Sequence, residues 1–238
     1  MSEHATSFGS VSGRYERGRP PYPEAALNWL LPAGAPRILD LGAGTGKLTR
    51  QIAARGLPVT AVDPSDGMLA QLRHVLPGVP ALQGTAEDIP LPAGSVDAVV
   101  CAQAWHWVDV ARAVPETARV LAPGGTLGLI WNLRDETTGW VRRLGEILRS
   151  PEQPRRTELG APYGPVEHHS VRWTHRLDLD RLLDLVASRS YVILLSDDDR
   201  AGLLDEVRHL AATHPDLAGR DTFELPYVTQ CARASLLR

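Results

Sequence analysis

The 238-residue chain has only two cysteines and a single lysine, which argues against several large protein classes. Its only two cysteines, Cys101 and Cys231, are too few for a disulfide framework, and no metal-ligand spacing accompanies them. Lys47 is the only lysine, so nearly all positive charge is carried by scattered arginines, and the net charge is −3. This balance gives no electrostatic reason to expect nucleic acid or an anionic membrane as a partner.

Long apolar runs and a signal-peptide pattern are also missing, so we expect no membrane-spanning segment. A hydrophobic content of 43% and a charged content of 22% are typical of globular proteins. We therefore expect a cytoplasmic protein with no nucleic-acid or membrane partner. We expect it to be a monomer or a homodimer.

The most informative stretch covers residues 37–49. The apolar run at residues 38–41 predicts a parallel strand that is buried on both faces. Gly42, Gly44 and Gly46 then turn the chain into a helix, and glycine allows the backbone to lie directly against a ligand. A strand that enters a helix through such a loop binds small ligands at its carboxyl end. The alternative is a glycine turn without a ligand.

The spacing of these glycines selects between ligands. The dinucleotide pattern G-x-G-x-x-G fails because Lys47 stands at its sixth position. The observed Asp-Leu-Gly-Ala-Gly-Thr-Gly at residues 40–46 instead resembles motif I of the class I S-adenosylmethionine (SAM)-dependent methyltransferases. The resemblance implies that Gly42 and Gly44, with Ala43, face the methionine part of SAM. It also implies that Asp40 orders the loop and the ammonium group, and that S-adenosylhomocysteine (SAH) is the product.

A second acidic residue follows at the expected distance. Residues 58–63 predict another strand, and Asp63 ends it about twenty residues beyond the glycine loop, where an acid binds ribose hydroxyls. A turn or cap aspartate is the alternative. Pro64 follows directly and is a further candidate cofactor contact. Met68 on the next helix is a candidate adenine contact or simply a core residue.

The segment at residues 84–90 resembles the stretch Gly-x-Ala-Glu-x-x-Pro, which packs on adenine in this family. The resemblance implies adenine contacts from Thr85, Ala86 and Glu87. Many members carry an acid where Thr85 stands, so its contact would pass to Glu87 or Asp88. The alternative is an acidic surface turn.

Residues 94–103 predict a further buried strand with Gln103 at its carboxyl end, and Trp105, His106 and Trp107 follow. Polar and aromatic residues at this edge belong where a substrate lies. His106 is the candidate catalytic base, because histidine titrates near neutral pH, although a packing histidine is the alternative. The expected acceptor site comprises Tyr22, Trp105, His106, Trp107 and Trp131.

The segment Tyr-x-x-x-Arg-Pro-x-Tyr-Pro at residues 15–23 resembles the N-terminal run of trans-aconitate methyltransferase-like enzymes. It predicts a lid in which Tyr15 and Arg19 cover the cofactor and Tyr22 faces the acceptor. The alternative is a polar arm that packs on the domain.

Alternating strands and helices up to residue 132 predict a doubly wound parallel sheet. Residues 109–121 predict a helix that contains Pro115, which would fit a first turn if the helix starts near Val114. Residues 126–132 predict the fifth strand, and 168–177 and 224–233 the last two. Together with the resemblance they predict an α/β, Rossmann-like, seven-stranded sheet, mostly parallel, with a C-terminal antiparallel hairpin and helices on both faces.

We expect one domain, with a lid at residues 1–32, a SAM-binding core at 33–132 and helices, an insertion and two strands at 133–238. The predicted function is methyl transfer to a small molecule, at a carboxylate or hydroxyl oxygen. An NAD(P)-dependent oxidoreductase and a non-catalytic SAM-binding protein are the alternatives. No Asn-Pro-Pro-Tyr-type motif lies near residues 102–106, which argues against amide or DNA-base methylation. No metal is expected, because His168 and His169 on one strand would point to opposite faces.

Overall fold

The computed structural model describes residues 18–31, 34, 37–150, 152 and 157–237. Its centre is a seven-stranded sheet with the order β3-β2-β1-β4-β5-β7-β6. The strands are β1 (Ile38–Leu41), β2 (Val59–Asp63), β3 (Ala81–Gln83), β4 (Val96–Ala102), β5 (Leu121–Arg134), β6 (Glu167–Leu177) and β7 (Phe223–Ser235).

Strands β1 to β5 pair in parallel, and β7 runs antiparallel to both of its neighbours, β5 and β6. The predicted fold class is therefore confirmed, as is the antiparallel pairing of the last two strands. Residues 178–222 connect β6 to β7 and form three helices.

The helices are α2 (Glu24–Leu30), α3 (Lys47–Ala53), α4 (Asp66–Val75), α5 (Val110–Val120), α6 (Gly139–Ile147), α7 (Leu179–Ala187), α8 (Ser190–Ile193) and α9 (Asp197–Thr213), with a 3₁₀ turn, η3 (Trp105–Trp107). Helix α5 begins at Val110, not near Val114, because the Asp109 carboxylate accepts the Ala111 N–H at 3.1 Å and caps it. Pro115 therefore lies inside the helix, where it cannot donate to the Ala111 carbonyl.

Strand β5 is longer at both ends than predicted. It starts at Leu121, and its pairing with β4 jumps from Val96↔Leu121 to Ala98↔Thr126. The segment Pro-Gly-Gly at residues 123–125 thus forms an irregularity within the strand.

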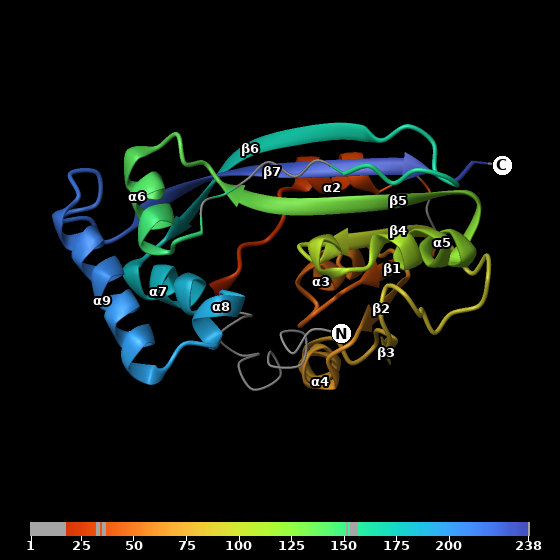
Figure 1. Cartoon of the computed structure of the whole chain (residues 1–238), viewed down its shortest axis with the longest axis horizontal. Coiled ribbons are helices and arrows are strands. Elements are labelled where there is room, and N and C mark those ends of the chain that lie inside the picture. Colours follow the sequence, from red (N-terminus) through yellow and green to blue (C-terminus); the bar gives the residue numbers. More distant parts are fainter. Residues whose placement is uncertain (1–17, 32–33, 35–36, 151, 153–156, 238) are drawn as a thin grey trace.

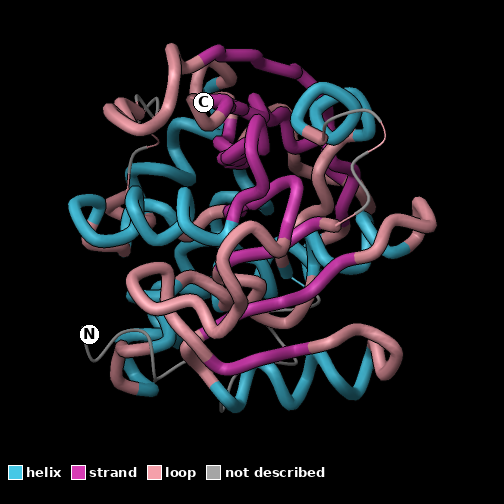
Figure 2. The backbone as a smooth tube through the Cα atoms, turned by 90° about the vertical axis from the view of Figure 1, so that its right-hand side faces the viewer, coloured by secondary structure: helices cyan, strands magenta, loops and turns pink. Residues whose placement is uncertain are grey.

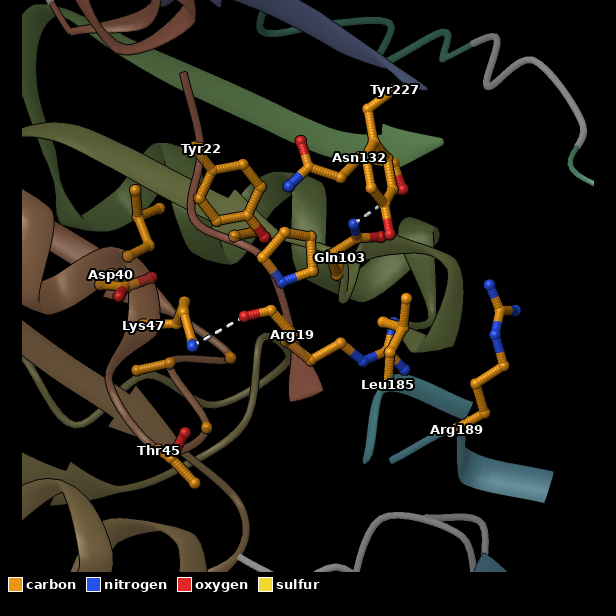
Figure 3. Close-up of a pocket in the computed structure, with 16 residues that line it drawn as sticks. Arg19, Tyr22, Asp40, Thr45, Lys47, Gln103, Asn132, Leu185, Arg189 and Tyr227 are labelled. Atoms are coloured by element: carbon orange, nitrogen blue, oxygen red, sulfur yellow. Dashed lines mark hydrogen bonds between the residues drawn. The ribbon is translucent and has the colours of Figure 1, made fainter. Parts of the chain in front are cut away.

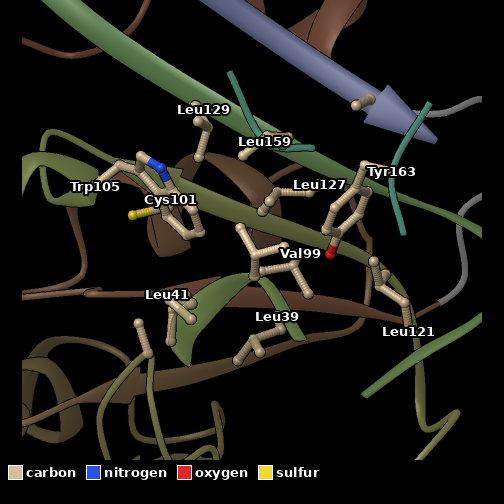
Figure 4. Close-up of a cluster of buried hydrophobic side chains, with 14 of the residues drawn as sticks. Leu39, Leu41, Val99, Cys101, Trp105, Leu121, Leu127, Leu129, Leu159 and Tyr163 are labelled. Carbon is tan, nitrogen blue, oxygen red and sulfur yellow. The ribbon is translucent and has the colours of Figure 1, made fainter. Parts of the chain in front are cut away.

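Helices cover both faces of the sheet, as Figure 2 shows. On one face α5 packs on a cluster that includes Leu39, Val99 and Leu127 (Figure 4). On the other face α2 and α3 contribute Leu27 and Ile52 to a second cluster. The central strands β1 and β4 are therefore buried on both sides, which explains their continuous apolar runs.

Helices α6 to α9 gather at one end of the molecule, beyond the carboxyl ends of β1 and β4 (Figure 1). They form a third apolar cluster with the adjoining parts of β6 and β7, and we call this region the cap. Its buried side chains include Trp140, Leu182, Leu185, Val207 and Tyr227. Among the described helices, none is long and apolar enough to cross a membrane.

Candidate functional site

A pocket lies where the carboxyl ends of β1 and β4 meet the cap (Figure 3). Three parts of the chain line it. The core wall comprises Asp40, the loop at 42–45, Ala102 and Gln103. The cap wall comprises Leu185, Arg189 and Tyr227, and the strap is residues 18–23, of which Arg19, Pro20 and Tyr22 line the pocket. Lys47, Leu48 and Asn132 complete the lining.

The glycine loop has the backbone shape that its sequence predicts. The φ angles of Gly42, Gly44 and Gly46 are +73°, +56° and +88°, a region that favours glycine. The N–H groups of Gly42 and Ala43 donate to the Val62 carbonyl at 2.8 and 3.1 Å, which ties the loop to β2. A Cβ on Gly44 would meet nothing within 4 Å, so this position offers bare backbone to the pocket.

Asp40 is fully buried at the floor of the core wall. One carboxylate oxygen, Oδ2, accepts the Thr49 hydroxyl at 2.6 Å, whereas Oδ1 has no hydrogen-bond partner among the described residues. Burial raises the pKa of Asp40 from 3.8 to about 7. A buried acid with an unsatisfied oxygen at a pocket is suited to a cationic ligand group, which would stabilise its charged form.

Asp63 lies at the tip of β2 and supports the loop. Its Oδ2 accepts the Gly44 N–H at 2.8 Å and its Oδ1 accepts the Ser65 N–H at 2.9 Å. Burial raises its pKa, and these backbone hydrogen bonds oppose that shift. The side chain is 8% exposed and is not part of the pocket lining. Each carboxylate oxygen keeps a second lone pair for a further donor.

The strap is held across the pocket by three side chains of the core. The Lys47 ammonium donates to the Arg19 carbonyl at 2.7 Å. Gln51 forms two hydrogen bonds with the backbone of Tyr22, and the Asn132 amide donates to the Pro21 carbonyl at 3.0 Å. The predicted lid residues Arg19 and Tyr22 thus both line the pocket, while Tyr15 lies outside the described residues.

Gln103 has a positive φ of 57°, which is uncommon for a residue other than glycine. Its N–H donates to the Ile130 carbonyl at 2.9 Å and its side-chain amide donates to the Asn132 carbonyl at 3.2 Å. These contacts hold the turn after β4 against β5 and place Gln103 in the core wall.

The residues predicted to contact adenine lie outside the pocket lining. Met68 is 4% exposed in the core, and its N–H donates to the Ser65 hydroxyl at 3.3 Å. Ala86 is 7% exposed, and Glu87 accepts the Asp109 N–H at 2.8 Å, which with other hydrogen bonds lowers its pKa despite some burial. Thr85 forms an isolated bridge with Asp88, and the Pro64 carbonyl accepts from Gln83.

Of the predicted acceptor residues, Tyr22 lines the pocket and the other four do not. Trp105 packs in the cluster under α5 (Figure 4), and Trp131 joins the same cluster. His106 is exposed on η3 with its ring 4.8 Å from that of Trp107, which is 56% exposed. None of these four side chains lines the pocket.

Trp131 lies outside the pocket lining for a simple reason. Side chains alternate between the two faces of a strand, so Trp131 follows Leu129 to the face under α5 while Asn132 points to the pocket. Applying this alternation to β5 would have selected Asn132. The cap-wall residues Leu185, Arg189 and Tyr227 lie far along the chain in segments without a motif, so no sequence signal marked them.

Comparisons with known proteins agree with this architecture. Residues 39–129 match a family described as a methyltransferase domain. An uncharacterized methyltransferase of Mycobacterium bovis is 59% identical over 232 residues, which covers 97% of this chain and 96% of that protein. A solved structure of a proposed type II methyltransferase from Anaeromyxobacter dehalogenans has a TM-score of 0.69 at 28% identity, covering 92% of this chain and 99% of that one.

A phospholethanolamine N-methyltransferase 2 of Haemonchus contortus shares the fold, with a TM-score of 0.58 at 16% identity. The match covers 100% of this chain and 61% of that one, whose structure contains phosphomonomethylethanolamine and SAH. With its glycine loop, sheet order and full-length relative, the chain belongs to the class I SAM-dependent methyltransferases. Its cofactor is SAM, and the unsatisfied Asp40 oxygen beside bare backbone at Gly44 fits the amino-acid part of that cofactor.

Proposed function

We propose that the core wall binds SAM and that the protein transfers its methyl group to a small-molecule acceptor held between the core wall, the strap and the cap wall. The observation that best supports this proposal concerns Asp40, which lines the pocket. Its buried Oδ1 has no hydrogen-bond partner among the described residues. The ammonium group of SAM would supply the missing donor and restore the charged carboxylate.

The remaining cofactor assignments follow the direction of the sheet. Gly42, Ala43 and Gly44 would lie along the methionine part, and Gln103 would border it. We assign the ribose to Asp63, because it stands behind the loop with free lone pairs. We assign Met68, Thr85, Ala86 and Glu87 to the adenine end of the cofactor, and Pro64 to a further contact beside Asp63.

SAM supplies a methyl carbon that is already activated by a sulfonium leaving group. The chain therefore needs mainly to align the acceptor with that carbon and to exclude water. The strap, tied to Lys47, Gln51 and Asn132, would close the pocket for this purpose. A carboxylate acceptor would need no catalytic base, whereas a hydroxyl acceptor would. The predicted base His106 is exposed away from the pocket lining, so its catalytic role lacks geometric support.

Binding and turnover test the proposal in sequence. Calorimetry with SAH and, separately, with NAD⁺ should give a complex with SAH alone. Incubation with methyl-labelled SAM and a library of small carboxylic acids and alcohols should then yield a labelled small molecule. Binding of NAD⁺ in place of SAH would reject the cofactor assignment. Tight SAH binding with no transfer to any acceptor would favour the non-catalytic alternative.

A further inference from the structure

The cap wall contributes a cation to the pocket, Arg189, whereas the core wall contributes the acid Asp40. Figure 3 shows Asp40 and Arg189 at opposite sides, with Arg19 of the strap between them. Arg189 follows the end of α7 and lines the pocket. Its Nε is buried and has no hydrogen-bond partner among the described residues. This N–H can therefore donate to an anionic or carbonyl group of a molecule bound in the pocket.

Behind the pocket, the Glu152 carboxylate forms ion pairs with both Arg134 and Arg189. The Glu152 Oε1 atom lies 2.9 Å from Arg189 Nη2 and also 2.9 Å from Arg134 Nε. Arg134 has a side chain that is 1% exposed, and its second acidic neighbour, Glu136, is 3.4 Å away. Burial and the nearby Arg189 lower the pKa of Arg134 to about 10.

The Glu152 carboxylate is therefore divided between the guanidinium groups of Arg134 and Arg189. The nearby arginines Arg189, Arg134 and Arg19 lower the pKa of Glu152 in spite of its burial. The Tyr227 hydroxyl, whose pKa burial raises to about 12, stays neutral and adds no negative charge. The charged group that the cap wall presents to the pocket is thus the Arg189 guanidinium.

We propose that Arg189 selects the methyl acceptor by binding a carboxylate group, with Arg134 and Glu152 as positioning residues that fix its guanidinium. This inference rests on the proposed function and names its substrate class, a small carboxylic acid. A carboxylate oxygen forms the new C–O bond as the methyl–sulfur bond breaks, and the bonding pair stays on sulfur. The carboxylate has no proton to lose, so the products are a methyl ester and SAH.

The experiment uses the full chain loaded with SAH or with methyl-labelled SAM. The probes are mono-, di- and tricarboxylic acids, each paired with its neutral primary amide. We expect acids but not amides to stabilise the SAH-loaded protein against heat and to accept label. In Arg189→Gln, kcat/KM for the best acid should fall roughly 100-fold, because a buried charge pair is lost. Arg189→Lys should recover part of this loss, since lysine keeps the positive charge but lacks the paired N–H donors of a guanidinium that bind both carboxylate oxygens.

Arg208→Gln on α9 is the matched control, because Arg208 is half-exposed in the cap, pairs with Asp205 and lies outside the pocket. It should behave like the unmodified protein. SAH affinity should stay within about twofold in Arg189→Gln, which shows that the variant is folded. Acids that neither stabilise nor react, amides that work as well as acids, or an unchanged kcat/KM in Arg189→Gln would overturn the inference. Failure of SAH to bind the unmodified protein would instead reject the proposed function itself.

Discussion

The core wall and the cap wall of one pocket are built in opposite ways. The core wall is largely backbone, shaped by Gly42 and Gly44 within a contiguous segment, and its charged group is the acid Asp40. The cap wall consists of side chains that come from residues 185, 189 and 227, and its charged group is an arginine. A shared cofactor can be bound by such a local motif, whereas acceptor recognition depends on side chains that tertiary structure assembles.

Of the substitutions in the core wall, Gly44→Val should weaken SAH binding most. A side chain at Gly44 enters the pocket itself, so we expect at least about 1,000-fold weaker SAH binding, equivalent to roughly 4 kcal/mol. The backbone strain of a β-branched residue at φ +56° should also lower stability by about 1–3 kcal/mol. Calorimetry and thermal unfolding measure the two effects.

Gly56→Val separates these two causes. Gly56 has a φ of +73° and equally open space, but it follows α3 outside the pocket lining. Its variant should be destabilised to a similar extent and bind SAH normally. Equal loss of affinity in both variants would mean that strain, not occupation of the pocket, is responsible.

Asp40→Asn should weaken SAH binding by roughly 100-fold at pH 8, because it removes the charge that pairs with the ligand ammonium. Since burial raises the pKa of Asp40 to about 7, the unmodified protein should bind SAH more tightly as the pH rises from 6 to 8. Calorimetry across this range should show the trend, and the variant should retain only the dependence due to the ligand itself. Identical pH profiles would remove Asp40 from the site.

The raised pKa of Asp40 also makes the free energy of unfolding depend on pH. Between pH 4 and 7 the empty folded protein binds the Asp40 proton more tightly than the unfolded chain does. The contribution of Asp40 to the free energy of unfolding therefore falls as the pH rises through that window. Denaturant unfolding of the unmodified protein and Asp40→Asn should diverge there, with the variant less sensitive to pH.

Asp63→Ala should have a smaller effect on the core wall, about a 10- to 30-fold loss of SAH affinity from the ribose contact and from the support of Gly44. Asp66→Ala is its control, since Asp66 is an exposed acid in the first turn of α4. Unchanged calorimetric affinity in Asp63→Ala would remove this residue from the cofactor site.

Lys47→Met sharpens the comparison at the strap. Loss of the Lys47–Arg19 hydrogen bond should speed SAH dissociation by about three- to tenfold, since a typical bond contributes about 1 kcal/mol. Stopped-flow displacement measures this rate. A rate equal to that of the unmodified protein would show that this bond does not hold the pocket closed.

The fold was largely predictable because its signals are local. Buried parallel strands are continuous apolar runs, and the loop after β1 needs three glycines whose φ angles are positive. For the same reason, the predicted residues Asp40, Gly42, Ala43, Gly44 and Gln103 all belong to the pocket lining. Arg19 and Tyr22 followed from a motif, and the strap places both at the pocket.

The rest depended on tertiary contacts. Trp105 and Trp131 were assigned to an acceptor site because aromatic residues suit a binding pocket, yet burial in the cluster under α5 accounts for both. The three helices between β6 and β7 bring Leu185 and Arg189 over the sheet edge. The local sequence of these helices does not indicate that the two residues line a pocket. An arginine in an arginine-rich chain carries no distinguishing mark until its neighbours are known.

A crystal structure of the protein with SAH tests the division of the pocket most directly. The account predicts that the ligand amino group lies within about 3 Å of Asp40 Oδ1, with the methionine chain along residues 42–44 and the ribose at Asp63. It also predicts open space between the ligand sulfur and Arg189. A ligand whose carboxylate is bound by Arg189 while Asp40 remains without a partner would contradict the account.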